Sequence, residues 1–226
     1  MRFKRVQIVR PWVIALDGPS AAGKGTLARR LAEHYDLAHL DTGSLYRAVG
    51  RRILRDGRDP KDTKYAAEIA TNLQPVDLTD PELRSEATSQ ASSIVAAIPE
   101  VRANLLAWQR EFAKNPPPGK RGVILDGRDI GTVICPDADV KLFVTAGLEA
   151  RAERRFQELQ AAGANPIRRA VLDEMASRDR RDSERAAAPL LPAQGAFVLD
   201  TSALDADAVF DRVVVFIESK TRSRRA

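Results

Sequence analysis

Residues 12–26 read Trp12-Val-Ile-Ala-Leu-Asp-Gly-Pro-Ser-Ala-Ala-Gly-Lys-Gly-Thr26, an apolar run followed by a glycine-rich turn. The turn has the pattern Gly18-x4-Gly23-Lys24, in which backbone N–H groups can surround a phosphate chain while Lys24 reaches its outer oxygens. A helical pattern follows over about 23–35 and would direct the positive end of its dipole at the same anion. This stretch predicts a phosphate-binding loop (P-loop) between a buried strand and a helix, and therefore a site for a nucleoside triphosphate.

The residues that follow Lys24 make the prediction more specific about how Mg²⁺ is bound. The serine or threonine that commonly follows the lysine and binds Mg²⁺ is replaced by Gly25, and Thr26 comes one place later. We expect Mg²⁺ to be carried mainly by the phosphates and water, which leaves its protein ligands open. The alternative for Thr26 is that it only caps the helix. All nine residues of the loop are candidates for binding the triphosphate: Gly18, Pro19, Ser20, Ala21, Ala22, Gly23, Lys24, Gly25 and Thr26.

Short apolar runs alternate with helical patterns along the rest of the chain. Because the runs are continuously apolar, both faces of the sheet should be covered, which indicates a three-layer α/β fold with a parallel sheet of about five strands. Phosphate sites in such folds lie beyond the carboxyl ends of the strands. The predicted strands are 13–16, 38–40, 123–125, 140–144 and 197–199, and the predicted helices are 23–35, 44–56, 64–72, 99–114, 147–162, 167–185 and 205–219.

Two segments interrupt this alternation and look inserted. One lacks strand patterns and ends in the stiff stretch Asn115-Pro-Pro-Pro-Gly119, and the other is almost entirely helical and rich in arginine. The second is typical of a mobile lid over a phosphate site. The predicted division is a core (11–71, 120–148 and 190–220), an insert (72–119), lid helices (149–189), an N-terminal extension (1–10) and a basic tail (221–226).

The lid segment carries an arginine cluster. Arg178, Arg181, Asp182 and Arg185 are spaced i, i+3, i+4 and i+7, so that a helix would place them on one face. Three guanidiniums around one carboxylate leave net positive charge, which favours a phosphate as the missing partner over a solvated salt-bridge face. Arg151, Arg154 and Arg155 repeat the pattern more weakly, because nearby glutamates could pair with them.

Phosphoryl transfer between two phosphorylated molecules needs positive charge and positioning rather than a general base. A monophosphate acceptor has a second pKa of about 6 and is already nucleophilic at neutral pH. The lack of a plausible catalytic His or Cys therefore does not argue against phosphoryl transfer. The candidate catalytic residues are Lys24, Arg128, Arg154, Arg181 and Arg185.

Charged residues also follow two other predicted strands. Asp41-Thr-Gly-Ser-Leu-Tyr46-Arg47 follows the second strand, with Thr42 as the expected helix cap. Asp126-Gly-Arg-Asp129 follows the third strand, and Asp126 lies where a second carboxylate near Mg²⁺ would fall. Charges after strands are often only turn residues. Beside a P-loop we interpret both groups as parts of the site.

Composition limits the class of protein. The chain has 226 residues, 44% of them apolar, enough for a sizeable core, and no apolar stretch long enough to cross a membrane. A single cysteine, Cys135, and the lack of a secretion-signal pattern favour a cytoplasmic protein. Although the net charge is +5, only 5% of residues are aromatic and none are interleaved with basic residues, so we expect no nucleic-acid partner. We expect a monomer.

Taken together, these motifs resemble the bacterial-type cytidylate kinases, a family of nucleoside monophosphate kinases. The resemblance covers about residues 12–216. It rests on 17–26, 41–47, Ser92-Ser-Ile-Val-Ala-Ala-Ile-Pro-Glu-Val-Arg102, Asp126-Gly-Arg-Asp-Ile-Gly-Thr132 and Arg178-Asp-x-x-Asp182-Ser-x-Arg185. It implies a P-loop kinase fold with a helical lid, and transfer of the γ-phosphoryl group of ATP, carried with Mg²⁺, to CMP or dCMP.

The resemblance also implies roles for individual residues. Ser93, Arg102 and Asp129 match positions that read the cytosine edge, where a carboxylate accepts from the amino group and would be repelled by uracil. The other implied contacts are Thr42, Tyr46 and Arg47 with the acceptor nucleotide, Arg128 near its phosphate, Arg178 and Asp182 near the ribose hydroxyls, and Arg185 near the transferred phosphate.

The resemblance implies that segment 72–119 is a shortened acceptor-binding insert. The chain departs from the family pattern after Leu73, where this insert is usually longer and contains a small antiparallel sheet. We expect base reading to be retained and leave open how the insert closes. Ala21 replaces a more usual glycine, and we expect a helix-like loop backbone to absorb the change. Two alternatives stay open: another P-loop kinase with a small acceptor, such as shikimate or a different monophosphate, and a non-catalytic or RNA-associated nucleotide binder.

Overall fold

A parallel sheet forms the centre of the molecule. In the computed structural model, which describes residues 11–223, the sheet has five strands in the order β2-β3-β1-β4-β5. The strands are β1 (Trp12–Asp17), β2 (Ala38–Asp41), β3 (Gly122–Gly127), β4 (Val140–Thr145) and β5 (Phe197–Asp200). Asp17 pairs with Gly127 and Asp41 with Asp126, so the carboxyl ends of these strands lie at one edge of the sheet. The predicted strands and the parallel sheet are confirmed.

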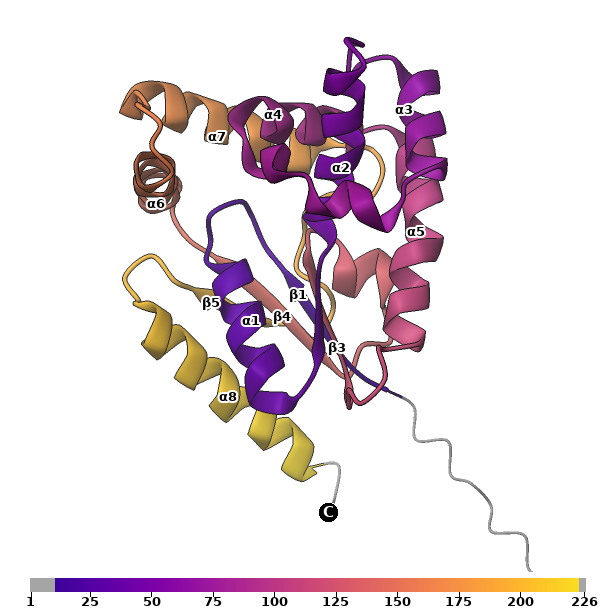
Figure 1. The fold of residues 1–226 in the computed structure, drawn as a ribbon. Coiled ribbons are helices and arrows are strands. Elements are labelled where there is room, and N and C mark those ends of the chain that lie inside the picture. Colours follow the sequence, from indigo (N-terminus) through magenta and orange to yellow (C-terminus); the bar gives the residue numbers. More distant parts are fainter. Residues whose placement is uncertain (1–10, 224–226) are drawn as a thin grey trace, which may run out of the picture.

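Helices cover both faces of the sheet (Figure 1). On one face, α1 (Lys24–Tyr35) packs against α8 (Ala206–Ser223), and Leu31, Val213 and Ile217 are fully buried between them and the strands. On the other face, the second half of α5 (Pro99–Lys114) packs through Ala113 against Val123 of β3. Burial on both sides explains why β1, β3 and β4 are apolar at successive positions.

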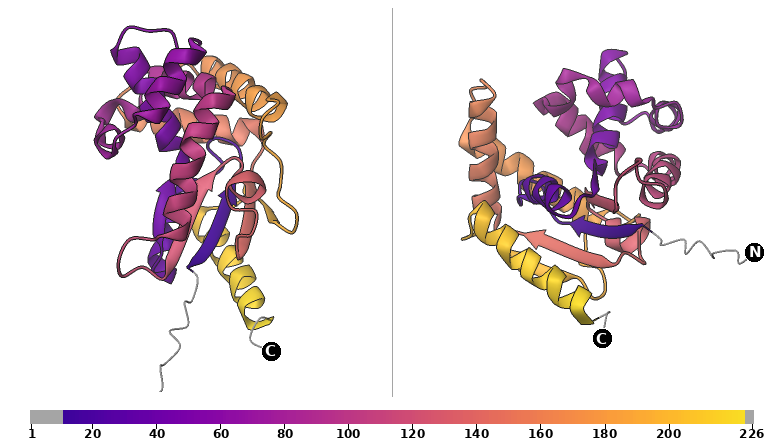
Figure 2. Two further views of the ribbon diagram at one scale, coloured as in Figure 1. Left: turned by 90° about the vertical axis from the view of Figure 1, so that its right-hand side faces the viewer. Right: turned by 60° about the horizontal axis from the view of Figure 1, so that its bottom comes forward.

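Beyond the carboxyl ends of the strands lies a helical region with its own core (Figure 2). It contains α2 (Thr42–Arg55), α3 (Thr63–Thr71), two 3₁₀ turns (Pro75–Thr79 and Pro81–Arg84), α4 (Glu86–Val95) and the first half of α5. Its core includes Leu45, Ile53, Val95 and Leu105. This region includes the predicted insert, and the described residues 72–119 contain no strand.

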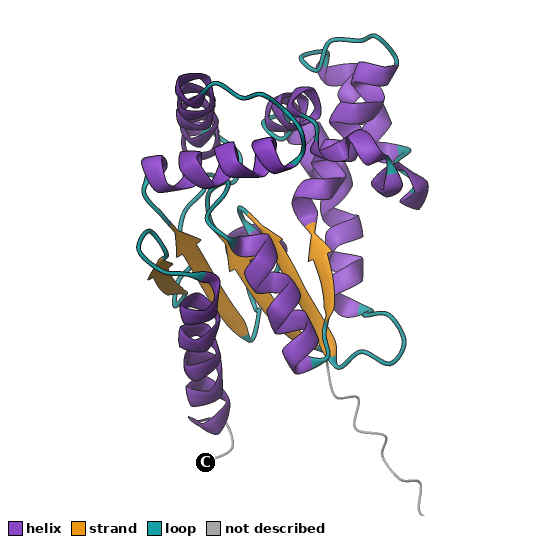
Figure 3. Ribbon diagram, turned by 60° about the vertical axis from the view of Figure 1, so that its left-hand side comes forward, coloured by secondary structure: helices purple, strands orange, loops and turns teal. Residues whose placement is uncertain are grey.

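The arginine-rich segment forms two helices, α6 (Leu148–Ala161) and α7 (Arg168–Glu184). A turn at Gly163, with φ +81°, joins them, and Phe156 and Met175 form a small core between them. Figure 3 shows both helices above the carboxyl ends of the strands, so α7 faces the P-loop from the opposite side to α1.

Three local features differ from expectation. Helix α2 begins at Thr42, whose hydroxyl donates to the carbonyl oxygen of Asp126 (2.8 Å) instead of capping the helix. Helix α7 ends at Glu184, and Arg185 has an extended backbone, so it leaves the face shared by Arg178, Arg181 and Asp182. A π-helical turn, Ile130–Ile134, follows β3 and was not predicted.

The predicted extension 1–10 lies outside the described residues, as do residues 224–226 of the predicted tail, whereas residues 221–223 continue α8. Across residues 11–223, no helix combines the length and the apolar character needed to span a bilayer.

Candidate active site

The P-loop connects β1 to α1 and needs a glycine at its entrance. A Cβ atom on Gly18 would lie 1.9 Å from the carbonyl oxygen of Val144, so no larger residue fits. Helix α1 begins at Lys24 with Gly23 as its N-cap, at φ +90°. Thr26 therefore lies in the first turn of the helix and does not cap it. The free N–H groups of this turn face the loop, which makes the helix end suitable for an anion.

Ala21 adopts a left-handed backbone, with φ +57°. The expected helix-like conformation is wrong at this residue. A left-handed backbone costs a residue with a Cβ atom about 1 kcal/mol or more, so contacts elsewhere must hold the loop in this shape.

Lys24 points into the concave side of the loop. Its ammonium group donates to the carbonyl oxygen of Pro19 (2.6 Å). Burial and the nearby guanidinium of Arg128 lower the pKa of Lys24 well below its usual value. A phosphate chain in the loop would supply the negative charge that favours the protonated form.

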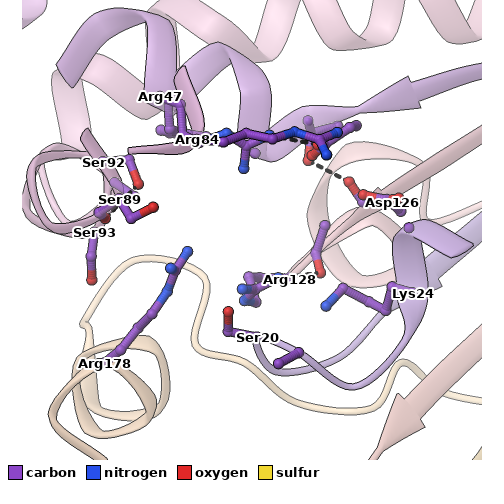
Figure 4. A pocket seen from close by; sticks show the side chains of 18 of the residues that line it. Ser20, Lys24, Arg47, Arg84, Ser89, Ser92, Ser93, Asp126, Arg128 and Arg178 are labelled. Atoms are coloured by element: carbon purple, nitrogen blue, oxygen red, sulfur yellow. Dashed lines mark hydrogen bonds and ion pairs between the residues drawn. The ribbon is translucent and has the colours of Figure 1, made fainter. Parts of the chain in front are cut away.

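A cavity of about 590 Å³ extends from the P-loop to the helical region. Figure 4 shows Lys24 and Ser20 at one end, Ser89, Ser92 and Ser93 at the other, and Arg128 and Arg178 between them. Most of the predicted site residues line it: Ser20, Ala21, Gly23, Lys24, Gly25, Thr26, Thr42, Tyr46, Arg47, Ser93, Arg102, Arg128, Asp129, Arg178, Asp182 and Arg185. The predicted residues that do not line it are Gly18, Pro19, Ala22, Arg154 and Arg181.

One end of the cavity brings together the predicted base-reading residues. Arg102 donates to the Asp129 carboxylate, and its guanidinium lies over the Tyr46 ring, 5.8 Å from the centroid. Asp129 is 4% exposed, and its second oxygen lies 3.9 Å from Arg185. Ser93 is buried on α4 and accepts a hydrogen bond from Arg181 (3.0 Å). A carboxylate, a guanidinium and a hydroxyl, 27 and 36 residues apart in the chain, thus surround one corner.

Two arginines occupy the middle of the cavity. Arg128 donates to Asp182 (2.9 Å), and although burial would raise the pKa of Asp182, Arg128 and Arg178 hold it below its usual value. Burial and Arg128 lower the pKa of Arg178 to about 10, and its buried Nε has no hydrogen-bond partner. The net positive charge predicted for this cluster is therefore not neutralised by Asp182 alone.

A buried carboxylate borders the P-loop side of the cavity. Asp126 accepts a hydrogen bond from His39 (3.0 Å), and its Oδ2 lies 4.0 Å from where a Cβ atom of Gly25 would be. Within residues 11–223, no group of three or more His, Cys, Asp or Glu side chains is arranged to hold a metal ion.

Asp17, at the end of β1, positions the residues after β3. Its two carboxylate oxygens accept from the N–H groups of Ile130 (2.7 Å) and Gly131 (2.8 Å). Burial raises the pKa of Asp17 to about 6, although these two hydrogen bonds oppose the rise. Asp17 thus fixes the start of the π-helical turn, directly after Asp129.

The three arginines at the start of α6 separate. Arg151 bonds to Asp179 of α7 and to the carbonyl oxygen of Ser20. Arg154 is turned toward Thr201 (2.5 Å to its carbonyl oxygen), and Arg155 lines the cavity beside Glu86. Their sequence spacing did not distinguish these three directions.

Arg84 also lines the cavity, although sequence reasoning did not select it. It ends the 3₁₀ turn Pro81–Arg84 and lies near Arg47 (Figure 4). Among the described residues its guanidinium has no hydrogen-bond or ion-pair partner. A short turn has no periodicity from which the direction of this side chain could be predicted. Its unpaired charge is the feature that indicates a residue of the site.

The family model and the relatives in sequence agree on one family. The chain matches the family model described as cytidylate kinase over residues 14–219. It is 57% identical to a protein of Paramagnetospirillum magneticum named cytidylate kinase, over 92% of this chain and 98% of that protein. It is 55% identical to one of the same name in Methylocella silvestris, over 95% and 97%.

Among solved structures, a shikimate kinase from Bacteroides thetaiotaomicron matches with a TM-score of 0.50 at 15% identity, over 92% of this chain and 98% of that one. At this identity the match concerns the fold alone, and it agrees with the predicted P-loop kinase architecture.

Proposed function

The chain belongs to the cytidylate kinase family, and we propose that its cavity joins a donor site for ATP to an acceptor site for CMP or dCMP. Its activity is phosphoryl transfer to these cytidine monophosphates. The single observation that carries the assignment of sites is the continuity of the cavity, which has the P-loop at one end and the Arg102–Asp129 pair at the other.

The donor half consists of the P-loop and the first turn of α1. Backbone N–H groups of the loop surround the phosphates, and Lys24 reaches the transferred group. Arg155, from α6, lines the same cavity and can face the donor from the lid. Segment 149–189 is thus proposed as the lid that closes over ATP.

The acceptor half reads the base and holds its phosphate. Asp129 accepts from the cytosine amino group, while Ser93 and Arg102 donate to the ring N3 and O2 acceptors. Uracil presents a carbonyl oxygen to Asp129 and is rejected. Segment 72–119 is proposed as the acceptor-binding insert, since it supplies both Ser93 and Arg102.

The acceptor phosphate lies among arginines. Arg47, Arg84 and Arg128 line the cavity between the base corner and the loop, and guanidiniums bind phosphate in a bidentate manner. Arg178 and Asp182 are proposed at the ribose hydroxyls. Arg181, which bonds to Ser93, joins α7 to α4 and would help to bring the lid onto the insert.

The chemistry is positioning and charge stabilisation. The acceptor phosphate attacks the γ-phosphorus of ATP, and ADP leaves with its electron pair, so no side chain has to remove a proton. Lys24, Arg128 and Arg185 stabilise the negative charge spread over the transferred group. The closed lid would exclude water, which would otherwise compete as the acceptor.

Mg²⁺ fits beside the loop as a phosphate-borne ion. Asp126 is the carboxylate next to Gly25, and oxygen ligands together with water suit Mg²⁺. When bound, Mg²⁺ neutralises charge on the donor phosphates. Because Gly25 has no hydroxyl, Asp126 is the proposed contact from the protein, directly or through water.

We also propose that the protein acts as a monomer in the cytoplasm, where ATP and CMP occur. Its single cysteine, Cys135, suits that reducing compartment.

An ADP-release assay with CMP, dCMP, UMP, AMP and shikimate as acceptors tests the proposal. We expect turnover with CMP and dCMP, and at least about a hundredfold lower kcat/KM with the others, as mismatched polar groups in a buried site would produce. Comparable turnover with UMP or AMP would contradict base reading. Turnover with shikimate alone would favour the other small-acceptor kinases.

A further inference from the structure

Side chains from outside the cavity hold the carbonyl groups on the outer side of the P-loop. Arg151, on α6, donates through Nη1 to the carbonyl oxygen of Ser20 (3.3 Å). The hydroxyl of Thr201, which follows β5, lies 3.2 Å from the carbonyl oxygen of Ala22. Neither side chain lines the cavity.

These contacts decide where the loop's N–H groups point. In a trans peptide the C=O and N–H bonds point in opposite directions. When Arg151 holds the oxygen of Ser20, the N–H of Ala21 is therefore directed to the other side, where Ser20 and Ala21 line the cavity. This is the orientation that a phosphate requires.

The same peptide leads into the disfavoured backbone of Ala21. At φ +57°, Ala21 would relax toward a negative φ unless its neighbours were held, and relaxation would rotate the adjoining peptides. Arg151 is the side chain that bonds to this peptide, so its contact opposes the rotation.

The Arg151 guanidinium joins three parts of the fold. Besides Ser20, it donates to the carbonyl oxygen of Ala146 (2.7 Å), just after β4, and in bidentate fashion to Asp179 of α7 (3.1 and 2.5 Å). Its side chain is 6% exposed. The outer side of the P-loop is therefore bonded through one buried group to the lid helix that carries Arg178 and Asp182.

We infer that Arg151 is a positioning residue that orients the Ser20–Ala21 peptide for the donor phosphates. Through Asp179 it also couples this orientation to the position of α7. The inference rests on the proposed donor role of the loop. Because coupling between two sites is reciprocal, a donor that fixes the loop also favours the lid position in which Asp179 meets Arg151.

The test measures ADP and CMP binding separately by calorimetry, together with the KM for ATP. In Arg151→Gln we expect ADP affinity to fall about 10- to 100-fold, the cost of a misplaced binding group, while CMP affinity changes less than about threefold. Arg151→Lys keeps a positive charge beside Asp179 but cannot make all the hydrogen bonds of the arginine. Its ADP affinity should therefore lie between those of the wild type and Arg151→Gln. Arg169→Gln, which removes an exposed pair with Asp173 on α7, is the matched control and should change neither.

The substitution Ala21→Gly distinguishes a positioning role of Arg151 from a purely structural one. Glycine accepts the left-handed backbone freely, so Arg151→Gln combined with Ala21→Gly should bind ADP about fivefold more tightly than Arg151→Gln alone. In the wild-type background, where the loop is already held, Ala21→Gly should change ADP affinity less than about twofold.

Three results would overturn the inference: unchanged ADP affinity in Arg151→Gln, equal losses of ADP and CMP affinity, or no recovery with Ala21→Gly. If Arg151→Gln does not fold, Arg151→Lys with and without Ala21→Gly gives the same comparison. Failure of the wild-type protein to bind ADP would instead contradict the proposed donor site.

Discussion

Lys24 is the buried cation at the bend of the P-loop, and its ammonium group rests on the carbonyl oxygen of Pro19. Lys24→Ala removes the charge that would reach the transferred phosphate, so we predict at least about a hundredfold loss of kcat. Burial of this charge is costly, so thermal unfolding should stay at the wild-type temperature or rise. ADP release and a thermal melt measure the two effects, and activity within tenfold of wild type would exclude the proposed role.

Asp17 makes the stability of the fold depend on pH. Its pKa rises from 3.8 to about 6 on folding, so between these values the folded state binds more protons than the unfolded state. The contribution of this group to the free energy of unfolding therefore falls by about 2 kcal/mol as the pH rises from 4 to 7, mostly before pH 6.

Asp17→Asn removes this titration while other groups titrate alike in both proteins. The stability of the variant relative to wild type, from urea unfolding, should improve by about 2 kcal/mol from pH 4 to pH 7. A difference that is constant with pH would show that Asp17 does not titrate in this range.

Single residues were predictable where a motif fixed them. The loop, Arg102 and Asp129 come from motifs, and the structure places them in one cavity. Sequence spacing could not predict where Arg154 and Arg84 point, since the direction of an arginine side chain depends on partners such as Thr201 that are distant in sequence. Asp17 was quoted only as part of the loop motif, because its partners Ile130 and Gly131 follow another strand.

At the scale of elements, the two lid helices have a core of their own. Phe156 packs with Met175, and the guanidinium of Arg168 lies 4.1 Å from the centroid of the Phe156 ring. Phe156→Ala should loosen α6 and α7 by about 3–5 kcal/mol, enough to open the lid locally and lower kcat/KM for ATP. Leu31→Ala, in the core between α1 and α8, is the matched control.

Hydrogen exchange distinguishes these two variants. Phe156→Ala should lose amide protection in α6 and α7 while α1 and the sheet stay protected, whereas Leu31→Ala should lower global stability and leave the lid no more exposed than the rest. Loss of protection throughout the protein in Phe156→Ala would mean that the lid is not a separate unit.

The elements themselves were largely predictable, since continuous apolar runs separated by helical patterns indicate a covered parallel sheet. The end of α7 was not. Arg185 fits the helical spacing, but its guanidinium turns to the carbonyl oxygen of Ala188 (2.6 Å) and toward Asp129, a tertiary contact that outweighs one more helical turn. The π-helical turn after β3 depends in the same way on Asp17.

At the scale of the molecule, the cavity lies where three segments distant in the chain meet. The P-loop, the insert with Ser93 and Arg102, and the arginines of α7 come together beyond the sheet. Order along the chain and a family resemblance indicated two nucleotides. That one cavity connects their sites depends on packing between helices, which no local pattern specifies.

The measurement that tests this account most directly is the ratio of kcat/KM for CMP to that for UMP, in the wild-type protein and in Asp129→Ala. We predict a ratio of at least about a hundred in the wild type, falling at least about tenfold in the variant, because UMP no longer meets a buried carboxylate while CMP loses its acceptor. An equal loss on both acceptors, with the ratio unchanged, would contradict the assignment of Asp129 and of this corner of the cavity to the cytosine base.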